Sequence, residues 1–281
     1  MNLRWARQLL MIKRITNRIK LAKNRYKNKN NVALYLHSPR QYRETIERLR
    51  DIHKGQRCFI LGNGPSLNKC NLALLGDEYS FAVNGIFYKT REMGYKPNFY
   101  MVEDNHVISD NLDEINNYRC DYKFFPAHYS NEIVPDDTTI FIPADYGFYR
   151  KGHPFYCKPR FSKNISEAIY TGQSVTMMQL QLAYHLGFSE VYLVGMDFNY
   201  DLPKSTIVEG VNYTSQEDDP NHFHPDYFGK GKKWHDPKLD RVLLSYQECK
   251  KNFEEDGRKI FNATVGGKLE LFDRVSYDSL F

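Results

Sequence analysis

The sequence lacks long apolar runs and paired cysteines, and both absences narrow the class of protein. No stretch approaches the roughly 18 apolar residues of a membrane-spanning helix, and the amino terminus shows no uninterrupted apolar core of a signal peptide. The five cysteines are scattered, without a Cys-x-x-Cys pair. They indicate neither a zinc site nor a disulfide framework. We therefore expect a cytoplasmic protein, kept in a reducing compartment.

Acidic residues are absent from the first 43 residues, which contain 12 Lys or Arg. The rest of the chain has 27 basic and 34 acidic residues, so the net charge of +5 comes from this tail. Within residues 1–30, apolar side chains recur every three or four residues from Trp5 to Tyr26. This spacing predicts a basic amphipathic helix.

Three partners suit a helix of this kind: an anionic membrane surface, another protein surface, or nucleic acid. We favour peripheral binding of residues 1–26 to the inner face of the membrane, and we expect no nucleic-acid partner. A homo-oligomer is also left open by the sequence.

The remaining chain reads as a linker with a helix (31–55), followed by a single Rossmann-like domain (56–281). Short apolar runs that alternate with helical segments predict an α/β fold with a mostly parallel sheet flanked by helices. The expected strands are 57–61, 80–83, 98–102, 123–125, 138–142, 191–194 and 259–262, and the expected helices are 39–53, 174–186 and 237–255. Ligands of such sheets bind at the carboxyl ends of the strands, where the strand order reverses.

A glycine-rich turn follows the first expected strand and consists of Gly62, Asn63, Gly64, Pro65 and Ser66. It is not a Walker loop, because the Gly-Lys-Ser/Thr sequence is absent, and Leu67 replaces the third glycine of the dinucleotide fingerprint. Two glycines nevertheless let the backbone approach a ligand closely, and Asn63 and Ser66 add polar groups. The turn predicts nucleotide contact, although an ordinary bend after a strand has the same composition.

Taken with Val83-Asn84-Gly85, the turn resembles the bacterial sialyltransferases of the Campylobacter type. The segment 186–198 contains Leu-Gly-Phe and ends in Gly-Met-Asp-Phe, similar to that family's Leu-Gly-Tyr turn and Gly-x-Asp-Phe strand. The likeness covers roughly residues 56–265. This region also resembles a broader group of motility-accessory and archaeal pterin-diphosphokinase-like (MptE-like) proteins.

The sialyltransferase resemblance implies a glycosyltransferase that moves a sugar from a CMP-linked donor to a surface glycan or glycolipid. It implies inversion at the sugar, with no metal or other cofactor. The sequence contains no Asp-x-Asp motif, the usual metal–diphosphate anchor of many glycosyltransferases. The residues expected to hold the donor nucleotide are Gly62, Asn63, Gly64, Pro65, Ser66, Asn84, Asp104, Thr171, Gly172, Ser174 and Asp197. For Asp197, orienting a neighbouring loop and capping the end of its strand are alternative roles.

Displacement at the anomeric carbon needs a base for the acceptor hydroxyl and stabilisation of the leaving phosphate. The resemblance puts the base in a loop after the Gly-x-Asp-Phe strand, where His222 matches best and His224 is the alternative. An imidazole suits this role because it titrates near neutral pH. Tyr200 or Tyr227 is expected to stabilise the leaving phosphate.

A basic loop close to the carboxyl-terminal helix is expected to cover the phosphate or hold the acceptor. Its predicted contact residues are Lys230, Lys233 and Trp234, with Trp234 offering a ring for a sugar to stack on.

The sialyltransferases carry an Arg shortly before the segment that corresponds to Thr171-Gly172, and this chain has none there. That departure argues against sialic acid itself and leaves other nucleotide-linked sugars. Two other functions stay open. One is an ATP- and Mg²⁺-dependent diphosphokinase of the hydroxymethylpterin type, with Asp104 and Asp197 as metal ligands; the other is a non-catalytic nucleotide-binding module.

Overall fold

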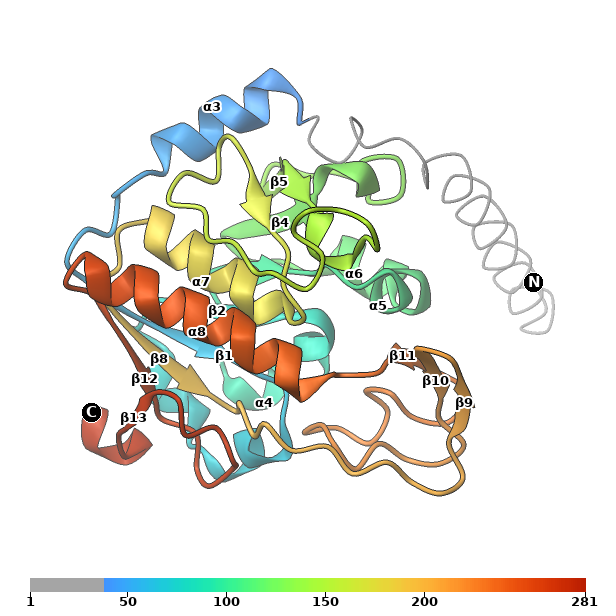
Figure 1. Ribbon diagram of the computed structural model, residues 1–281. Coiled ribbons are helices and arrows are strands. Elements are labelled where there is room, and N and C mark those ends of the chain that lie inside the picture. Colours follow the sequence, from blue (N-terminus) through green and yellow to red (C-terminus); the bar gives the residue numbers. More distant parts are fainter. Residues whose placement is uncertain (1–37) are drawn as a thin grey trace, which may run out of the picture.

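The computed structural model describes residues 38–281, which form an α/β structure around one eight-stranded sheet (Figure 1). The strand order is β13-β12-β8-β1-β2-β3-β4-β5, and every pairing is parallel. This arrangement confirms the predicted Rossmann-like sheet. The amphipathic helix predicted for residues 1–30 lies outside the described residues, as does the first part of the predicted linker.

The expected strands all occur, with bounds that differ from the expectation by at most one residue. They are β1 (Arg57–Leu61), β2 (Ser80–Val83), β3 (Phe99–Met101), β4 (Tyr122–Pro126), β5 (Thr139–Ile142), β8 (Glu190–Val194) and β12 (Lys259–Asn262), and β13 (Asp273–Arg274) is added at the edge. The helices are α3 (Arg40–Arg48), α4 (Thr90–Met93), α5 (Asn105–Asp110), α6 (Leu112–Asn117), α7 (Val175–His185) and α8 (Leu239–Glu255). Helix α3 ends five residues before the predicted His53.

Helices cover both faces of the sheet, which explains why its strands are apolar without alternation. Cys58 and Ile60 of β1 pack on the face covered by α3, α7 and α8. Figure 1 shows α7 and α8 in front of the sheet and α3 above it. Phe59 and Leu61 point to the opposite face, toward α4, α5, α6 and the segment after β1. The side-chain alternation of a strand thus divides the core into two halves.

Helix α7 is the central helix, and ten of its eleven residues are buried. The Ser174 hydroxyl caps its amino end by accepting a hydrogen bond from the backbone N–H of Thr176 (3.2 Å). Gly187 has a φ of +95° immediately after the helix, a left-handed conformation that glycine adopts readily. This confirms the helix stop predicted at Gly187.

Two small sheets were not predicted, because their strands have only two or three residues and show no readable periodicity. One contains β9 (Ile207–Glu209), β10 (Asn212–Thr214) and β11 (Lys233–His235), and the other contains β6 (Ala144–Asp145) and β7 (Ile169–Tyr170). The expected loop around Lys233 and Trp234 was therefore wrong, since these residues pair with β10. Within the described chain, no helix combines the length and apolarity that crossing a membrane requires.

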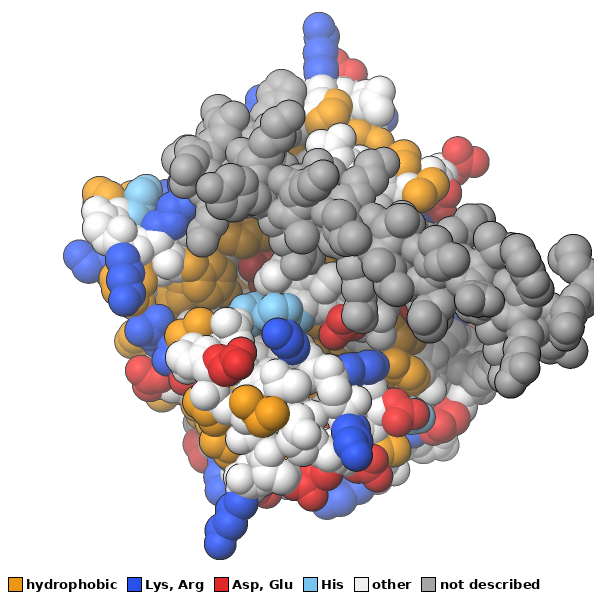
Figure 2. Space-filling model, turned by 90° about the vertical axis from the view of Figure 1, so that its right-hand side faces the viewer, with side chains coloured by type: hydrophobic (Ala, Val, Ile, Leu, Met, Phe, Trp, Pro, Cys, Tyr) orange, Lys and Arg blue, Asp and Glu red, His pale blue; other side chains and the backbone are white. Residues whose placement is uncertain are grey.

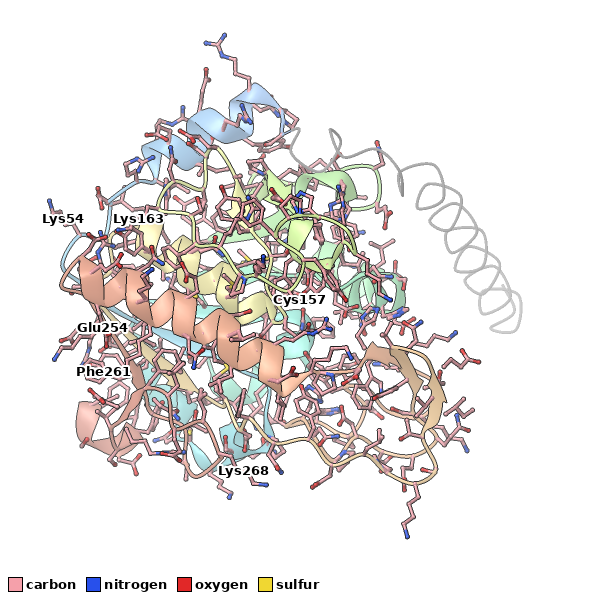
Figure 3. The ribbon with its side chains drawn as sticks, viewed as in Figure 1. Lys54, Cys157, Lys163, Glu254, Phe261 and Lys268 are labelled. Carbon is pink, nitrogen blue, oxygen red and sulfur yellow. The ribbon has the colours of Figure 1, made fainter. Side chains whose placement is uncertain are left out.

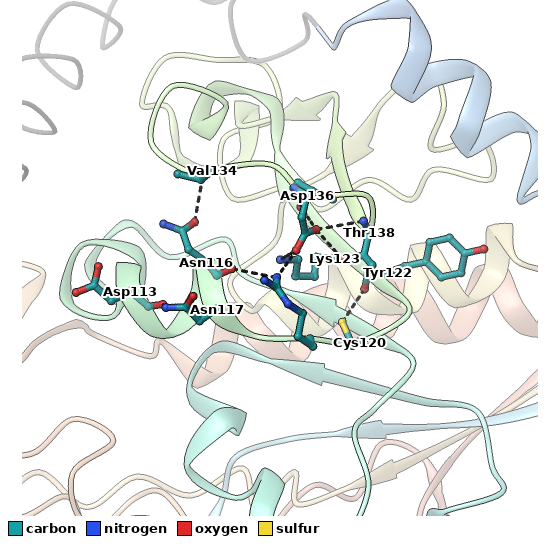
Figure 4. A network of polar contacts seen from close by, with 11 residues as sticks. Asp113, Asn116, Asn117, Cys120, Tyr122, Lys123, Val134, Asp136 and Thr138 are labelled. Atoms are coloured by element: carbon teal, nitrogen blue, oxygen red, sulfur yellow. Dashed lines mark hydrogen bonds and ion pairs between the residues drawn. The ribbon is translucent and has the colours of Figure 1, made fainter.

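A polar cluster lies at the amino ends of β4 and β5 (Figure 4). Lys123 is fully buried in β4, and its ammonium group contacts the Asp136 carboxylate at 2.7 Å. Arg119 pairs with the same carboxylate, and Thr138 and Thr139 donate hydroxyl hydrogen bonds to it. Burial alone would raise the pKa of Asp136, but these contacts, led by Lys123, lower it below the ordinary value. This carboxylate is thus saturated with hydrogen bonds.

Strand order reverses between β1 and β8. From β1 the chain runs outward through β2, β3 and β4 to β5, and then returns to β8 on the other side of β1. The turns that follow β1 and β8 consequently meet at the carboxyl end of the sheet, at the location predicted for a ligand.

Candidate functional site

A cavity of about 210 Å³ opens at this carboxyl edge. Its walls come from the turns after β1, β2, β3 and β8, the amino ends of α7 and α8, and parts of residues 198–236. Eleven residues predicted for the site line it: Gly62, Asn63, Gly64, Asn84, Asp104, Ser174, Asp197, Tyr200, His222, Tyr227 and Trp234.

Seven predicted residues do not line the cavity: Pro65, Ser66, Thr171, Gly172, His224, Lys230 and Lys233. Thr171 is buried and bonded to the Asp145 carbonyl. A Cβ on Gly172 would lie 2.3 Å from the Met177 sulfur, so this glycine permits packing at the start of α7. The His224 ring stacks on Tyr88, with 4.7 Å between ring centroids. These residues shape the surroundings of the cavity.

The glycine-rich turn is held by the turn after β8. The Ser66 hydroxyl donates to the Asp197 carboxylate (2.6 Å), and the backbone N–H of Ser66 points to the same group. A Cβ on Gly64 would lie 1.9 Å from an Asp197 oxygen, and one on Gly62 would lie 2.5 Å from the Gly195 carbonyl oxygen. Both glycines therefore allow two protein turns to approach each other. Asp197 thus contacts the glycine-rich turn and also lines the cavity.

Three amide oxygens of cavity-lining residues are buried and accept no hydrogen bond: Asn63 Oδ1, Asn84 Oδ1 and Gln173 Oε1. Asn63 uses its NH₂ group for the Val83 carbonyl (3.0 Å) and the Tyr227 hydroxyl (2.9 Å). Asn84 has a φ of +50°, a conformation that asparagine tolerates better than most residues. Buried acceptors without a donor are rare in folded proteins. Gln173 was missed, although it stands between the predicted Gly172 and Ser174.

His222 is held by a carboxylate that the sequence analysis did not identify. Its Nδ1 lies 2.7 Å from Asp219 Oδ2, and its ring stacks on Tyr227 at 4.1 Å. Burial alone would raise the pKa of Asp219, but the hydrogen bond from His222 and those from backbone N–H groups lower it. Because Nδ1 faces Asp219, Nε2 is the ring nitrogen of His222 that does not contact this carboxylate. The His222 side chain is 8% exposed.

A second carboxylate–histidine pair lies at the β3 side of the cavity. His235 Nδ1 is 2.9 Å from Asp104 Oδ2, and the other Asp104 oxygen caps α5 by accepting from the His106 N–H. Burial alone would lower the pKa of His235, but the hydrogen bond and charge of Asp104 raise it overall. The His235 side chain is 37% exposed. Burial raises the pKa of the adjoining Glu103 to about 8, so this carboxyl group is largely protonated at neutral pH.

The predicted aromatic and basic residues occupy different environments. Tyr227 is buried, and burial raises the pKa of its phenol, which therefore stays protonated. Trp234 is only 5% exposed and donates its indole N–H to Ser215, so it lacks the open stacking face that we expected. Lys230 and Lys233 are exposed outside the cavity. Figure 2 shows the face of the molecule on which basic and acidic side chains mix around a group of histidines.

The cavity lining carries four acidic residues and, among the described residues, no Lys or Arg. The acidic residues are Glu103, Asp104, Asp197 and Asp236. Positive potential comes instead from the amino ends of α7 and α8, where helix N–H groups and dipoles favour a negative group. The cavity thus combines side-chain hydrogen-bond acceptors with the amino ends of two helices.

A preformed Mg²⁺ site does not fit this lining. The two carboxylates considered as metal ligands are occupied, Asp197 by Ser66 and Asp104 by His235 and the start of α5. Over residues 38–281, no group of three or more His, Cys, Asp or Glu side chains has the arrangement of a metal site.

Comparison with known proteins identifies the family. The profile of the family described as 6-hydroxymethylpterin diphosphokinase MptE-like matches residues 34–202, more than half of the chain. The chain belongs to this MptE-like family. Among curated proteins, none matches.

The family match confirms the pterin-diphosphokinase-like part of the resemblance, whereas the sialyltransferase-like part stays a prediction. The matched segment contains the turns after β1, β2, β3 and β8. It ends before His222 and His235, so membership of the MptE-like family says nothing about these two side chains.

Proposed function

We propose that this MptE-like protein is a glycosyltransferase that uses a nucleotide-linked, most simply CMP-linked, sugar donor. One observation carries the proposal: two carboxylate-held imidazoles line a cavity at the switch point of a Rossmann-like sheet. The unpartnered amide oxygens there suit the amino group of a cytosine or the hydroxyls of a ribose. The amino ends of α7 and α8 suit a single phosphate.

The proposed reaction is a direct displacement with inversion, without a metal ion. The acceptor O–H gives its proton to a histidine while its oxygen forms a bond to the anomeric carbon. The bond from that carbon to the phosphate oxygen breaks, and its electron pair stays on the released nucleoside monophosphate. Tyr227 or Tyr200 donates a hydrogen bond to the departing phosphate.

Two histidines are candidates for the base. His222 is the choice from the sequence, and Asp219 keeps its ring in place. A base must meet the acceptor hydroxyl directly, and the His235 ring is 37% exposed against 8% for His222. We therefore place His235 first and His222 second. The pairing with Asp104 would keep His235 strongly basic.

Single variants decide between the two histidines. We expect His235→Ala to lower sugar transfer from a CMP-linked donor by about 10²- to 10⁴-fold, with CMP affinity within threefold of the wild type. His222→Ala should have the smaller effect on turnover, and His224→Ala is the matched control. Full activity of both the His235 and the His222 variant would refute the catalytic mechanism.

The pH dependence gives a second measure of the base. Because Asp104 raises the pKa of His235, Asp104→Asn should lower that pKa. His235 then loses its proton at lower pH, so the rising limb of the pH–rate profile moves to lower pH. An unchanged limb would indicate that His235 is not the base.

A second candidate is the ATP-dependent diphosphokinase reaction, which is favoured by the description of the matched family. It requires a Mg²⁺–ATP complex that brings its metal with it, because the cavity carboxylates are occupied. A calorimetric titration with CMP, UMP, GMP and ATP, with and without Mg²⁺, separates the candidates. Tight CMP binding in EDTA favours sugar transfer, and binding of ATP only with Mg²⁺ favours the kinase.

A further inference from the structure

One segment near the cavity contains basic and no acidic side chains, unlike the cavity lining. Residues 146–166, called here the basic loop, contain five Lys or Arg and no Asp or Glu. The cavity, by contrast, is lined by four acidic residues. Within the loop, Lys151 and Lys158 are exposed, whereas Arg160 pairs with Asp145 and Lys163 pairs with Asp256. Lys151 and Lys158 therefore present their charges to solvent.

Two contacts join the basic loop to residues that are next in sequence to the cavity lining. The Tyr149 hydroxyl donates to the carbonyl of Gly172, next to the cavity-lining Gln173. The guanidinium of Arg241, in the first turn of α8, lies 5.7 Å from the ring centroid of Tyr156. Figure 3 labels Cys157 within the loop, near the amino-terminal part of α7. It labels Lys163 near the carboxyl-terminal end of α8, where this lysine pairs with Asp256.

Backbone hydrogen bonds give the loop a defined shape. The Cys157 N–H donates to the Phe148 carbonyl, and the His153 N–H donates to the Arg150 carbonyl. Arg160 lies between the rings of Phe155 and Tyr170, 4.1 and 3.9 Å from their centroids. A loop fixed in this way loses little conformational freedom when it binds a partner.

We propose that the basic loop docks an acidic glycan, the chain that presents the acceptor hydroxyl to the cavity. The inference rests on the proposed transfer to a glycan. Positive side chains outside an acidic cavity attract a polyanionic chain to the rim, while its uncharged hydroxyl end enters. Exposed aromatic rings beside the lysines, such as Tyr149 and Phe155, give sugar rings a surface to stack on.

Cys157 provides a local test, because it is a free, partly exposed thiol inside the loop. The rate of its alkylation in the full chain is measured by mass spectrometry with a heparin-derived hexasaccharide and with neutral maltohexaose. Cys70, also free and partly exposed, is the internal control. We expect the anionic hexasaccharide to slow alkylation of Cys157 at least fivefold and to leave Cys70 unchanged. Maltohexaose should protect neither thiol.

Charge-reversal variants identify the surface. In Lys151→Glu/Lys158→Glu the protection of Cys157 should disappear, and in the matched control Lys230→Glu/Lys233→Glu it should remain. Protection that survives in the first variant, protection by maltohexaose, or no protection at all would overturn the proposal. So would protection by phosphatidylserine vesicles alone, which would indicate a membrane. The assay needs no turnover, so its failure is distinguishable from failure of the proposed enzymatic function.

Discussion

Two polar clusters at opposite ends of the sheet differ in how their buried acceptors are satisfied. At the amino ends of β4 and β5, the Asp136 carboxylate accepts hydrogen bonds from Lys123, Thr138 and Thr139. At the carboxyl ends, amide oxygens of Asn63, Asn84 and Gln173 accept none. A saturated cluster stabilises the fold, whereas unsatisfied acceptors cost stability unless a ligand supplies the donors. The contrast separates the residues that maintain the sheet from those that await a partner.

Breaking the saturated cluster should have the largest effect on stability. Asp136→Ala leaves the buried ammonium of Lys123 without its main counter-charge, and we expect the free energy of unfolding to fall by about 3 kcal/mol. Urea denaturation followed by circular dichroism measures the change. Nucleotide affinity of the folded variant should match that of the wild type, because the cluster lies at the far end of the sheet.

The double variant Lys123→Met/Asp136→Ala is the control, because it removes the stranded charge and should recover part of the loss. A double variant less stable than Asp136→Ala would contradict this interpretation. The pKa of Asp136 is lowered in the folded state, so its stabilisation is present above the unfolded-state pKa and is lost as the pH falls. The difference between wild type and Asp136→Ala should shrink below about pH 4.

Disturbing the contact between the glycine-rich turn (62–66) and the turn after β8 should have the second-largest effect on stability. Gly64→Ala would put a Cβ 1.9 Å from an Asp197 oxygen, and displacement of that carboxylate weakens its bond to Ser66. We expect a loss of about 1–3 kcal/mol in unfolding free energy, together with weaker nucleotide binding. Gly76→Ala is the matched control, because its nearest contact would be an ordinary 3.4 Å. Equal stability of the two variants would show that the turns tolerate separation.

Sequence patterns predicted the sheet well because each strand is a short apolar run, as β1 and β8 illustrate. They also predicted eleven of the residues that line the cavity, since the carboxyl ends of parallel strands converge. Such patterns could not predict contacts between residues that are far apart in the sequence. Asp104 and His235 are 131 positions apart, and nothing in the sequence marks them as a pair. The Asp219–His222 pair, only three positions apart, offered a signal that was missed.

The loop predicted at Lys233 and Trp234 was wrong for a different physical reason. A lysine-rich stretch favours solvent, but the strand β11 places alternate side chains on opposite faces. Trp234 is buried while Lys233 is exposed, so the tryptophan packs into the wall of the cavity and the lysine stays outside. Two other exposed lysines, Lys151 and Lys158, lie in the basic loop (146–166).

The variant with the smallest expected effect on stability removes one of the amide oxygens that lack a hydrogen-bond donor. Gln173→Met removes the amide oxygen that lacks a donor, so the free energy of unfolding without ligand should stay within about 0.5 kcal/mol of the wild type. Affinity for the preferred nucleotide should nevertheless fall about two- to tenfold, the value of one hydrogen bond. Thermal unfolding and calorimetric titration measure the two quantities. Gln41→Met, at an exposed position of α3, should change neither. If Gln173→Met lowered stability without weakening nucleotide binding, Gln173 would belong with the saturated cluster as a structural residue.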